Sequence, residues 1–250
     1  MALRTMNHFL QYGEPIIKRT VPLAIGLLRI SNPEVGVMDL LVKLSYDSDK
    51  NTAKSAILAL GLIGAGTNNS RVAGSLRDLA SYYSTAADVL FVVRVSQGLI
   101  HLGKGMLGLS PMHSNKFLFS NVSLAGILTV LYAATDMDLF ICGQYHYFLY
   151  YLVLAMYPRM LVTLNEKLET VKVSVKVGQA VDTVGAAGKP KTITGFQIHD
   201  TPVLIGNSER AEFATEEFLS CNSCMENFVI IKRNPDYEGD KEQEGKGNKK

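Results

Sequence analysis

The segment of this chain that comes nearest to a phosphate-binding loop is GLIHLGKG, residues 98–105. Its spacing fits a nucleotide-binding loop as far as Lys104, but that loop needs a hydroxyl next, to hold Mg²⁺, and Gly105 stands there. Such a loop also follows a β-strand, whereas this segment has the periodicity of a helix. We therefore predict a repeat helix that ends at a glycine cap.

A second glycine-rich segment, GAGTNN at residues 64–69, resembles part of a dinucleotide-binding loop. The third glycine of that loop is absent, and no strand pattern precedes the segment. A helix that ends at Gly64 or Gly66 explains the same residues, because glycine favours helix C-termini and small polar residues favour N-termini. The candidates for the next N-cap are Thr67, Asn68 and Asn69.

The cysteine pair CNSC, Cys221 and Cys224, has the spacing of half a structural zinc site. A closed site needs four ligands, and among other ligand types only His199 lies moderately close in sequence. Two ordinary thiols in a turn are the simpler interpretation. With Cys142 the cysteines number three, which favours a reducing compartment, so the chain is predicted to be cytoplasmic and nuclear.

The remaining candidates for chemistry do not form a known pattern. No HExxH or GxSxG motif occurs, and no serine, histidine and acid set can be assembled by motif. The sequence therefore predicts no enzyme, no cofactor and no catalytic, cofactor-binding or metal-binding residue. The scattered histidines, interpreted as structural, are His8, His101, His113, His146 and His199.

Composition is typical of a well-packed protein of one large or two modest domains, with 250 residues, 47% hydrophobic and 19% charged. The formal net charge of +2 gives no indication of nucleic-acid binding. Residues 1–12 lack the apolar core of a signal peptide. The most apolar stretch, residues 147–157, is about half the roughly 20 residues that cross a bilayer, so no membrane partner is predicted.

Residues 1–158 are predicted to form an α-helical repeat solenoid, because apolar residues recur at helical spacing between polar turns. Apolar segments with a central glycine recur, and these glycines are separated by 35, 37 and 28 residues. The last, shorter interval indicates an atypical end unit. The aligned glycines are Gly26, Gly61, Gly98 and Gly126.

Each of these glycines costs about 1 kcal/mol relative to alanine inside a helix. Their recurrence therefore indicates a gain that offsets the cost. We expect that gain to be the close approach of neighbouring helix backbones, because alanines accompany the glycines and leave little side chain between the helices. These alanines are Ala24, Ala59 and Ala125.

Residues 159–237 are predicted to form a small antiparallel β-rich module. The clearest signal is VKVSVKV, residues 171–177, whose valines alternate with polar residues as in a half-buried strand. The tail at 238–250 has no apolar residue and is predicted to be disordered. The further strand candidates are 179–184, 191–198, 201–206, 210–215 and 227–233. The whole chain is thus expected to be α+β.

The repeat strings GLIGAGTNNSRVAGSLRDLA, residues 61–80, and VRVSQGLIHLGKGMLGLSP, residues 93–111, resemble the proteasome/cyclosome repeats of the large non-ATPase subunits of the proteasome regulatory particle. The strings at 173–205, 209–219 and 228–237 resemble the C-terminal end of the smaller of the two large scaffold subunits of its base. Family members are several times longer, so the resemblance covers about their C-terminal quarter. The sister scaffold and the repeat subunit of the anaphase-promoting complex remain alternatives, and a nucleotide- or zinc-binding enzyme is an alternative of another class.

This resemblance implies a non-catalytic scaffold and enzyme regulator in ubiquitin-dependent protein degradation. It implies contacts with the ATPase-ring subunits and with other regulatory-particle subunits. Family members also receive ubiquitin, ubiquitin-like shuttle proteins and a deubiquitinase, but those surfaces belong to earlier repeats. Because the chain starts within the repeats, we expect an uncovered apolar face on its first helix, formed by Met1, Leu3, Met6, Phe9 and Leu10.

Overall fold

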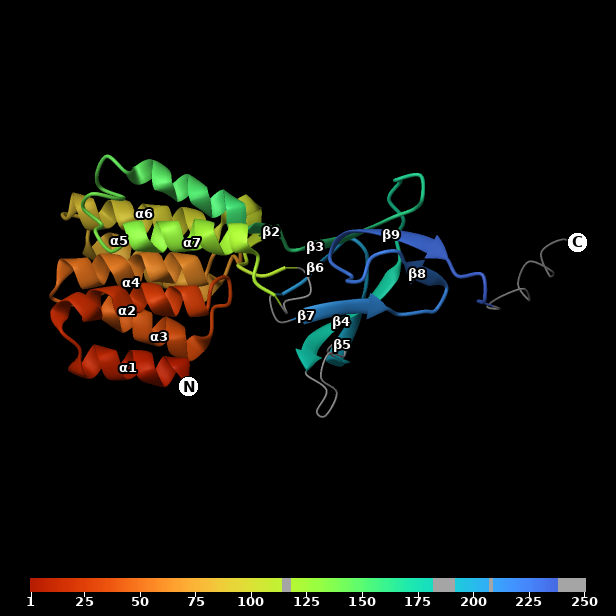
Figure 1. Ribbon diagram of the computed structural model, residues 1–250, viewed down its shortest axis with the longest axis horizontal. Helices are drawn as coiled ribbons and strands as arrows, with labels where there is room; N and C mark the ends of the chain where they lie inside the picture. The colour runs from red at the N-terminus through yellow and green to blue at the C-terminus, as the bar shows by residue number, and fades with distance from the viewer. Residues whose placement is uncertain (114–117, 182–191, 207–208, 238–250) are drawn as a thin grey trace, which may run out of the picture. The chain divides into compact units, whose positions relative to one another are not determined.

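The computed structural model describes residues 1–113, 118–181, 192–206 and 209–237, so the expected tail at 238–250 lies outside the described residues. The chain divides into two compact units, Met1–Pro158 and Arg159–Lys250. The first is helical and the second is built of strands, which confirms the predicted α+β class (Figure 1).

The helical unit consists mainly of α-helices, with two short strands near its end. The elements are α1 (Ala2–Tyr12), α2 (Pro15–Leu28), α3 (Val35–Leu44), α4 (Lys50–Ile63), α5 (Ser70–Tyr82), α6 (Ala87–Ile100), the 3₁₀ helix η1 (Leu102–Gly105), β1 (Leu107–Leu109), α7 (Asn121–Ala133), the 3₁₀ helix η2 (His146–Ala155) and β2 (Met156–Pro158).

The first six helices form three stacked hairpins, as expected of a repeat solenoid. Helix α1 packs on α2, α3 on α4, and α5 on α6. Within the stack α2 packs on α4 and α4 on α6, so these three helices form an inner row (Figure 1). Helix α7 packs mainly against η2 and also touches α2.

The turn between α4 and α5 follows the sequence prediction. Gly64 is the C-cap of α4, and the side chain of Asn69 accepts hydrogen bonds from the first backbone amides of α5. The prediction for the next helix is wrong in detail. Helix α6 ends at Ile100 with His101 as its C-cap, before Gly103 and Gly105, and left-handed backbone follows at Gly103.

The expected close approach of helices is confirmed at the first two aligned glycines. A methyl group placed on Gly26 of α2 would lie 3.3 Å from the β-carbon of Ala59 in α4. One placed on Gly61 of α4 would lie 2.8 Å from the Cα of Ser96 in α6, which is closer than real side chains come to a neighbouring backbone. Position 61 therefore has no room for a side chain beside the backbone of α6.

The other two aligned glycines differ from this prediction. Around Gly98 of α6 no described residue beyond its own stretch of helix comes within 4 Å of where its methyl group would be, because no further described inner helix stacks on that face. Gly126 of α7 does make a close approach, but its partner is η2, where the carbonyl oxygen of Tyr151 would lie 2.5 Å away. Thus α7 is not the fourth helix of the inner row.

Hydrogen bonds between successive turns hold the ends of the inner helices in register. The amide of Ser31 donates to the carbonyl of Leu62, and one repeat later the amide of Gly66 donates to Leu99. Both donors have positive φ, 51° at Ser31 and 66° at Gly66. Strand β1 returns to the first of these turns, where the amide of Leu109 donates to the Ser31 hydroxyl at 2.7 Å.

The apolar face expected to lie open on the first helix is partly covered. Leu3, Met6 and Leu10 are half-buried against the helical core, so the prediction is wrong for these residues. Met1 and Phe9 remain exposed. The difference arises because α1 pairs with α2 inside its own hairpin, and this contact uses much of the apolar face.

The second unit holds strands in two sheets. Its strands are β3 (Met160–Leu164), β4 (Ser174–Val181), β5 (Thr192–Asp200), β6 (Val203–Leu204), β7 (Glu209–Phe213), β8 (Phe218–Ser220) and β9 (Asn227–Arg233). One sheet has the order β6-β3-β9-β8 and the other β5-β4-β7. The pairing is mostly antiparallel, but β3 and β9 are parallel, which the sequence analysis did not anticipate.

The alternating valines behave as predicted, since Val173, Val175 and Val177 are all buried in the core of this unit. The predicted break between 171–177 and 179–184 is wrong. Residues 174–177 of the first segment and 179–181 of the second belong to the continuous strand β4, with a register shift between Val177 and Gln179, and residues 171–173 precede the strand. Residues 182–184 lie outside the described part of the chain.

Candidate protein-binding groove

The lysine of the glycine-rich segment lies in a tight turn rather than in a phosphate loop. Helix α6, not a strand, precedes it, and Lys104 itself has a positive φ of 58°. One side chain fastens this turn to the previous repeat: the amide nitrogen of Asn68 donates to the carbonyl of Lys104 at 3.0 Å, and its oxygen lies 2.8 Å from Nδ1 of His101. This geometry assigns the segment to the repeat.

The other candidate ligands are not brought together. Cys221 is exposed and Cys224 is half-buried, between β8 and β9, whereas His199 lies on β5 in the other sheet. Within the described ranges no group of three or more histidine, cysteine, aspartate or glutamate side chains is arranged to hold a metal ion. The remaining histidines are distributed over separate segments.

A buried lysine joins three parts of the helical unit, and the sequence analysis did not single it out. Lys54 of α4 has only 3% of its side chain exposed, and its Nζ lies 2.8 Å from Asp88 and 2.7 Å from Asp138. Burial alone would lower the pKa of Lys54, but hydrogen bonds to Asp138 and Asp88 outweigh it and raise the pKa. The bond from Lys54 in turn lowers the pKa of Asp88. This arrangement links α4 to α6 and to the segment after α7.

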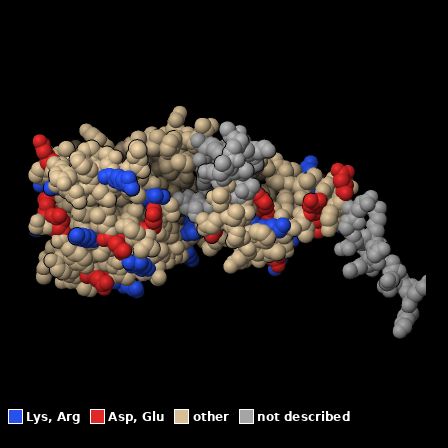
Figure 2. Space-filling model, turned by 90° about the horizontal axis from the view of Figure 1, so that it is seen from below, with Lys and Arg blue, Asp and Glu red and all other residues tan. Residues whose placement is uncertain are grey.

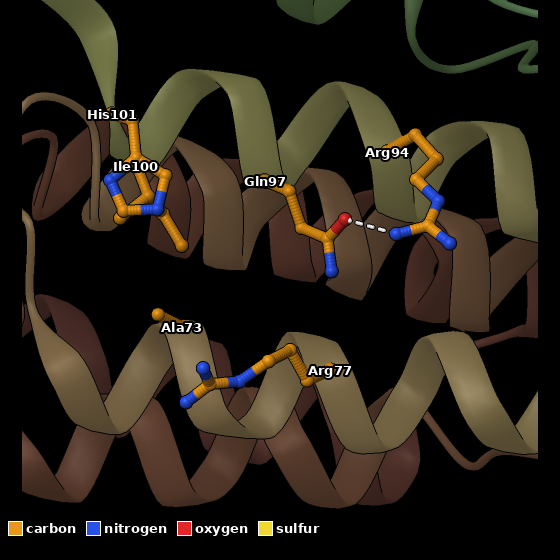
Figure 3. A pocket seen from close by; sticks show the side chains of 6 residues that line it. All are labelled: Ala73, Arg77, Arg94, Gln97, Ile100 and His101. Atoms are coloured by element: carbon orange, nitrogen blue, oxygen red, sulfur yellow. Dashed lines mark hydrogen bonds between the residues drawn. The ribbon is translucent and has the colours of Figure 1, made fainter. Parts of the chain in front are cut away.

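The third hairpin carries an open groove of about 330 Å³ between α5 and α6 (Figure 3). Helix α5 contributes a small and a basic side chain, while α6 and its C-cap contribute basic, amide, apolar and imidazole groups. No lining residue is acidic. The lining residues are Ala73, Arg77, Arg94, Gln97, Ile100 and His101.

Hydrogen bonds fix one of the two arginines. Nη1 of Arg94 donates to Oε1 of Gln97 at 2.8 Å (Figure 3). Nε2 of Gln97 donates to the Leu76 carbonyl on α5. A guanidinium has five N–H donors, so this bond leaves most of the donors of Arg94 for another acceptor. In the part of the chain that the structure describes, neither Arg94 nor Arg77 has a carboxylate within ion-pair distance.

The second hairpin shows what this face looks like when another hairpin covers it. Val37 and Leu41 of α3 correspond to Val72 and Leu76 of α5, and all four are buried. Corresponding positions on the inner helices α4 and α6 are 37 residues apart in the sequence, as Gly61 and Gly98 are.

With this alignment, the apolar stacking face of the second hairpin becomes polar and basic in the third. Ile57 and Leu60, which are fully buried, correspond to Arg94 and Gln97. On the outer helices the half-buried Val42 corresponds to the exposed Arg77. A stacking face with basic residues in place of aliphatic ones suits a charged partner better than another apolar repeat.

Two further corresponding pairs shape the groove. Gly64, beneath Ile100 and Val72 of the next hairpin, corresponds to His101. The larger Met38 corresponds to Ala73, and this loss of volume opens the groove. The groove residues were missed in the sequence because they form no motif, although the repeat alignment already showed aliphatic residues replaced by arginine.

On the face of the helical unit seen in Figure 2, lysines and arginines are interspersed with aspartates and glutamates. None of the described helices combines the length and the apolar character needed to span a bilayer.

Comparison with known protein families gives two matches. Residues 55–88 match the proteasome/cyclosome repeat, and residues 184–237 match the C-terminal family of the 26S proteasome non-ATPase regulatory subunit RPN1. The first match covers α5, which forms one wall of the groove, and the second falls within the β-rich unit.

Curated relatives extend these matches along the chain. The 26S proteasome non-ATPase regulatory subunit 2 homolog A of Arabidopsis thaliana is 58% identical over 95% of this chain. The regulatory subunit rpn-1 of Neurospora crassa is 53% identical over 96%, and the regulatory subunit rpn1 of Schizosaccharomyces pombe 48% over 94%. The chain spans about a quarter of these relatives, 27%, 27% and 26%. It belongs to the family of the 26S proteasome non-ATPase regulatory subunit 2, or RPN1, and carries residues of its C-terminal region.

Proposed function

We propose that the chain is a non-catalytic scaffold of the proteasome regulatory particle, acting in ubiquitin-dependent protein degradation through protein–protein contacts. The observation that carries this proposal is the 58% identity to a 26S proteasome regulatory subunit along nearly the whole chain. Stacked helical hairpins support it, since solenoids present extended surfaces for binding other proteins.

The partners are the ATPase-ring subunits and neighbouring subunits of the regulatory particle, and the chain works in the cytoplasm and nucleus. The resemblance implies that longer family members bind ubiquitin and ubiquitin-like shuttle proteins, and we expect those surfaces to lie outside the segment that corresponds to this chain. The scaffold contributes by holding partners at fixed positions, which requires packed surfaces rather than reactive groups.

Affinity purification of the tagged chain from cells tests the assignment. The expected result is co-purification of regulatory-particle subunits at a constant ratio through a second sizing step. Recovery of the folded chain alone, in repeated purifications at low salt, would contradict the scaffold role for this chain.

The enzyme alternative is tested on the same protein with variants of the two motif-like segments. Lys104→Ala, and Cys221→Ser combined with Cys224→Ser, are expected to leave subunit recovery unchanged and the free energy of unfolding within about 0.5 kcal/mol. Zinc analysis and an ATP titration of the purified chain accompany them. Stoichiometric zinc, or saturable ATP binding lost in Lys104→Ala, would establish a site of the other class.

A further inference from the structure

We propose that the groove between α5 and α6 binds an acidic segment of a partner protein, whose carboxylates bond with Arg77 and Arg94. The proposal goes beyond the scaffold assignment by giving the chemistry of one partner and the residues that recognise it. It is tested on the purified chain and so can fail or succeed independently of assembly into the proteasome.

Charge is the first argument for an acidic occupant. Arg77 and Arg94 face one groove from two helices, His101 lies at its end, and no acidic residue lines it (Figure 3). The neighbouring Asp78 is exposed and is not a lining residue. Guanidinium groups bind carboxylates in a bidentate manner, so two of them fit a segment with two acidic side chains.

The second argument is continuity with the stacking interface inside the chain. The same face of the second hairpin is covered by the third hairpin, which shows that this surface of the repeat is built to be occupied. In the third hairpin the centre of this surface is basic. Ile100 lines the groove but is fully buried, and the exposed Phe91 lies one helical turn before Arg94 on α6. An occupant therefore needs apolar contacts together with negative charge, as an amphipathic acidic segment has.

Gln97 prepares the groove for this occupant. It accepts from Arg94 and donates to the backbone of α5, so it holds the guanidinium at the groove without neutralising its charge. A carboxylate at that place would have made a closed ion pair within the chain. The neutral partner leaves the positive charge to be balanced from outside.

The experiment is an anisotropy titration of the full chain with a fluorescein-labelled peptide carrying leucine and glutamate at helical spacing. A peptide with lysine in place of glutamate is the matched probe. We expect saturable binding of the Leu–Glu peptide only, weakening as salt is raised. Arg77→Gln combined with Arg94→Gln is expected to weaken binding about tenfold or more.

The control variant, Arg4→Gln combined with Lys43→Gln, removes the same net charge from exposed positions on α1 and α3, and it should bind as the parent does. Circular dichroism melts of both variants establish that they fold. Equal binding of the two peptides, or equal weakening by both variants, would overturn the proposal. So would sedimentation showing that a second copy of the chain covers the groove, as a dimer lost in the Arg77/Arg94 variant.

Discussion

The second and third hairpins have the same backbone plan and opposite surface chemistry on the same face. In the second hairpin, Gly61 and Ile57 are buried beneath α6, and Gly61 permits contact with the backbone at Ser96. In the third, Gly98 has open space around it and Arg94 is exposed. The third hairpin therefore keeps the glycine that permits stacking, although no described helix stacks on it. The change from aliphatic to basic and polar side chains marks the end of the apolar stack.

The largest effect that tests this contrast is expected from valine at the two glycines. Gly61→Val should destabilise the helical unit by roughly 1 to 3 kcal/mol, because the new side chain overlaps the α6 backbone. Gly98→Val should be neutral or slightly stabilising, since valine is the better helix former and meets no neighbour. Urea unfolding of both variants checks this, and equal stabilities would remove the argument from close packing.

The next effect concerns the charge that links the second hairpin to the third. Lys54→Met should cost about 1.5 kcal/mol, the contribution of a hydrogen bond between charged groups. Because the pKa of Asp88 is lowered in the fold, its stabilising contribution is present above the unfolded value of about 3.9 and is lost as pH falls through the folded value.

The pH dependence therefore separates this ion pair from simple loss of packing. Between pH 5 and pH 3 the parent should lose more stability than Lys54→Met, as measured by urea unfolding at each pH. Lys54 itself acts at the alkaline end, where its contribution is lost as pH rises through its raised pKa. Parallel pH profiles for parent and variant would mean that Lys54 contributes packing only.

The smallest effect on stability is expected from making the third hairpin resemble the second. Arg94→Ile combined with Gln97→Leu should lower the free energy of unfolding by about 1 kcal/mol or less, because Gln97 loses its hydrogen bond to the Leu76 carbonyl. The change should appear instead as concentration-dependent association, because it creates a larger apolar patch. Analytical ultracentrifugation tests this, and a variant that sediments as the parent does would show that polarity at this face does not control stacking.

Sequence patterns predicted the elements that depend on local periodicity. The alternating valines gave the buried face of β4, and Gly64 and Asn69 were among the cap candidates named from residue type. Partners distant in sequence were not predictable in this way. Gly98 and Gly126 have the same local pattern as Gly61, yet one faces open space and the other η2, because tertiary stacking decides what each glycine meets.

The same reason explains the missed features of the β unit and the groove. Short strands such as β8 carry too few residues to show a period, and the parallel pairing of β3 with β9 joins the two ends of the module. Arg77 and Arg94 belong to two helices and act together only after the hairpin forms. The family could be predicted from the sequence because long strings of residues carry the resemblance. The groove residues could not be predicted in this way.

The return of strand β1 to the first turn has a consequence for how the helical unit comes apart. In an ordinary solenoid each repeat contacts only its neighbours, so the end repeats fray first. Here the amide of Leu109 bonds with Ser31, and Lys54 bonds with Asp138, which closes loops of 78 and 84 residues across the stack. Fraying of the first hairpin must break contacts made by the last segment, and unfolding becomes a single concerted event. Amide hydrogens in α2, α4 and α6 should then exchange with one common opening free energy.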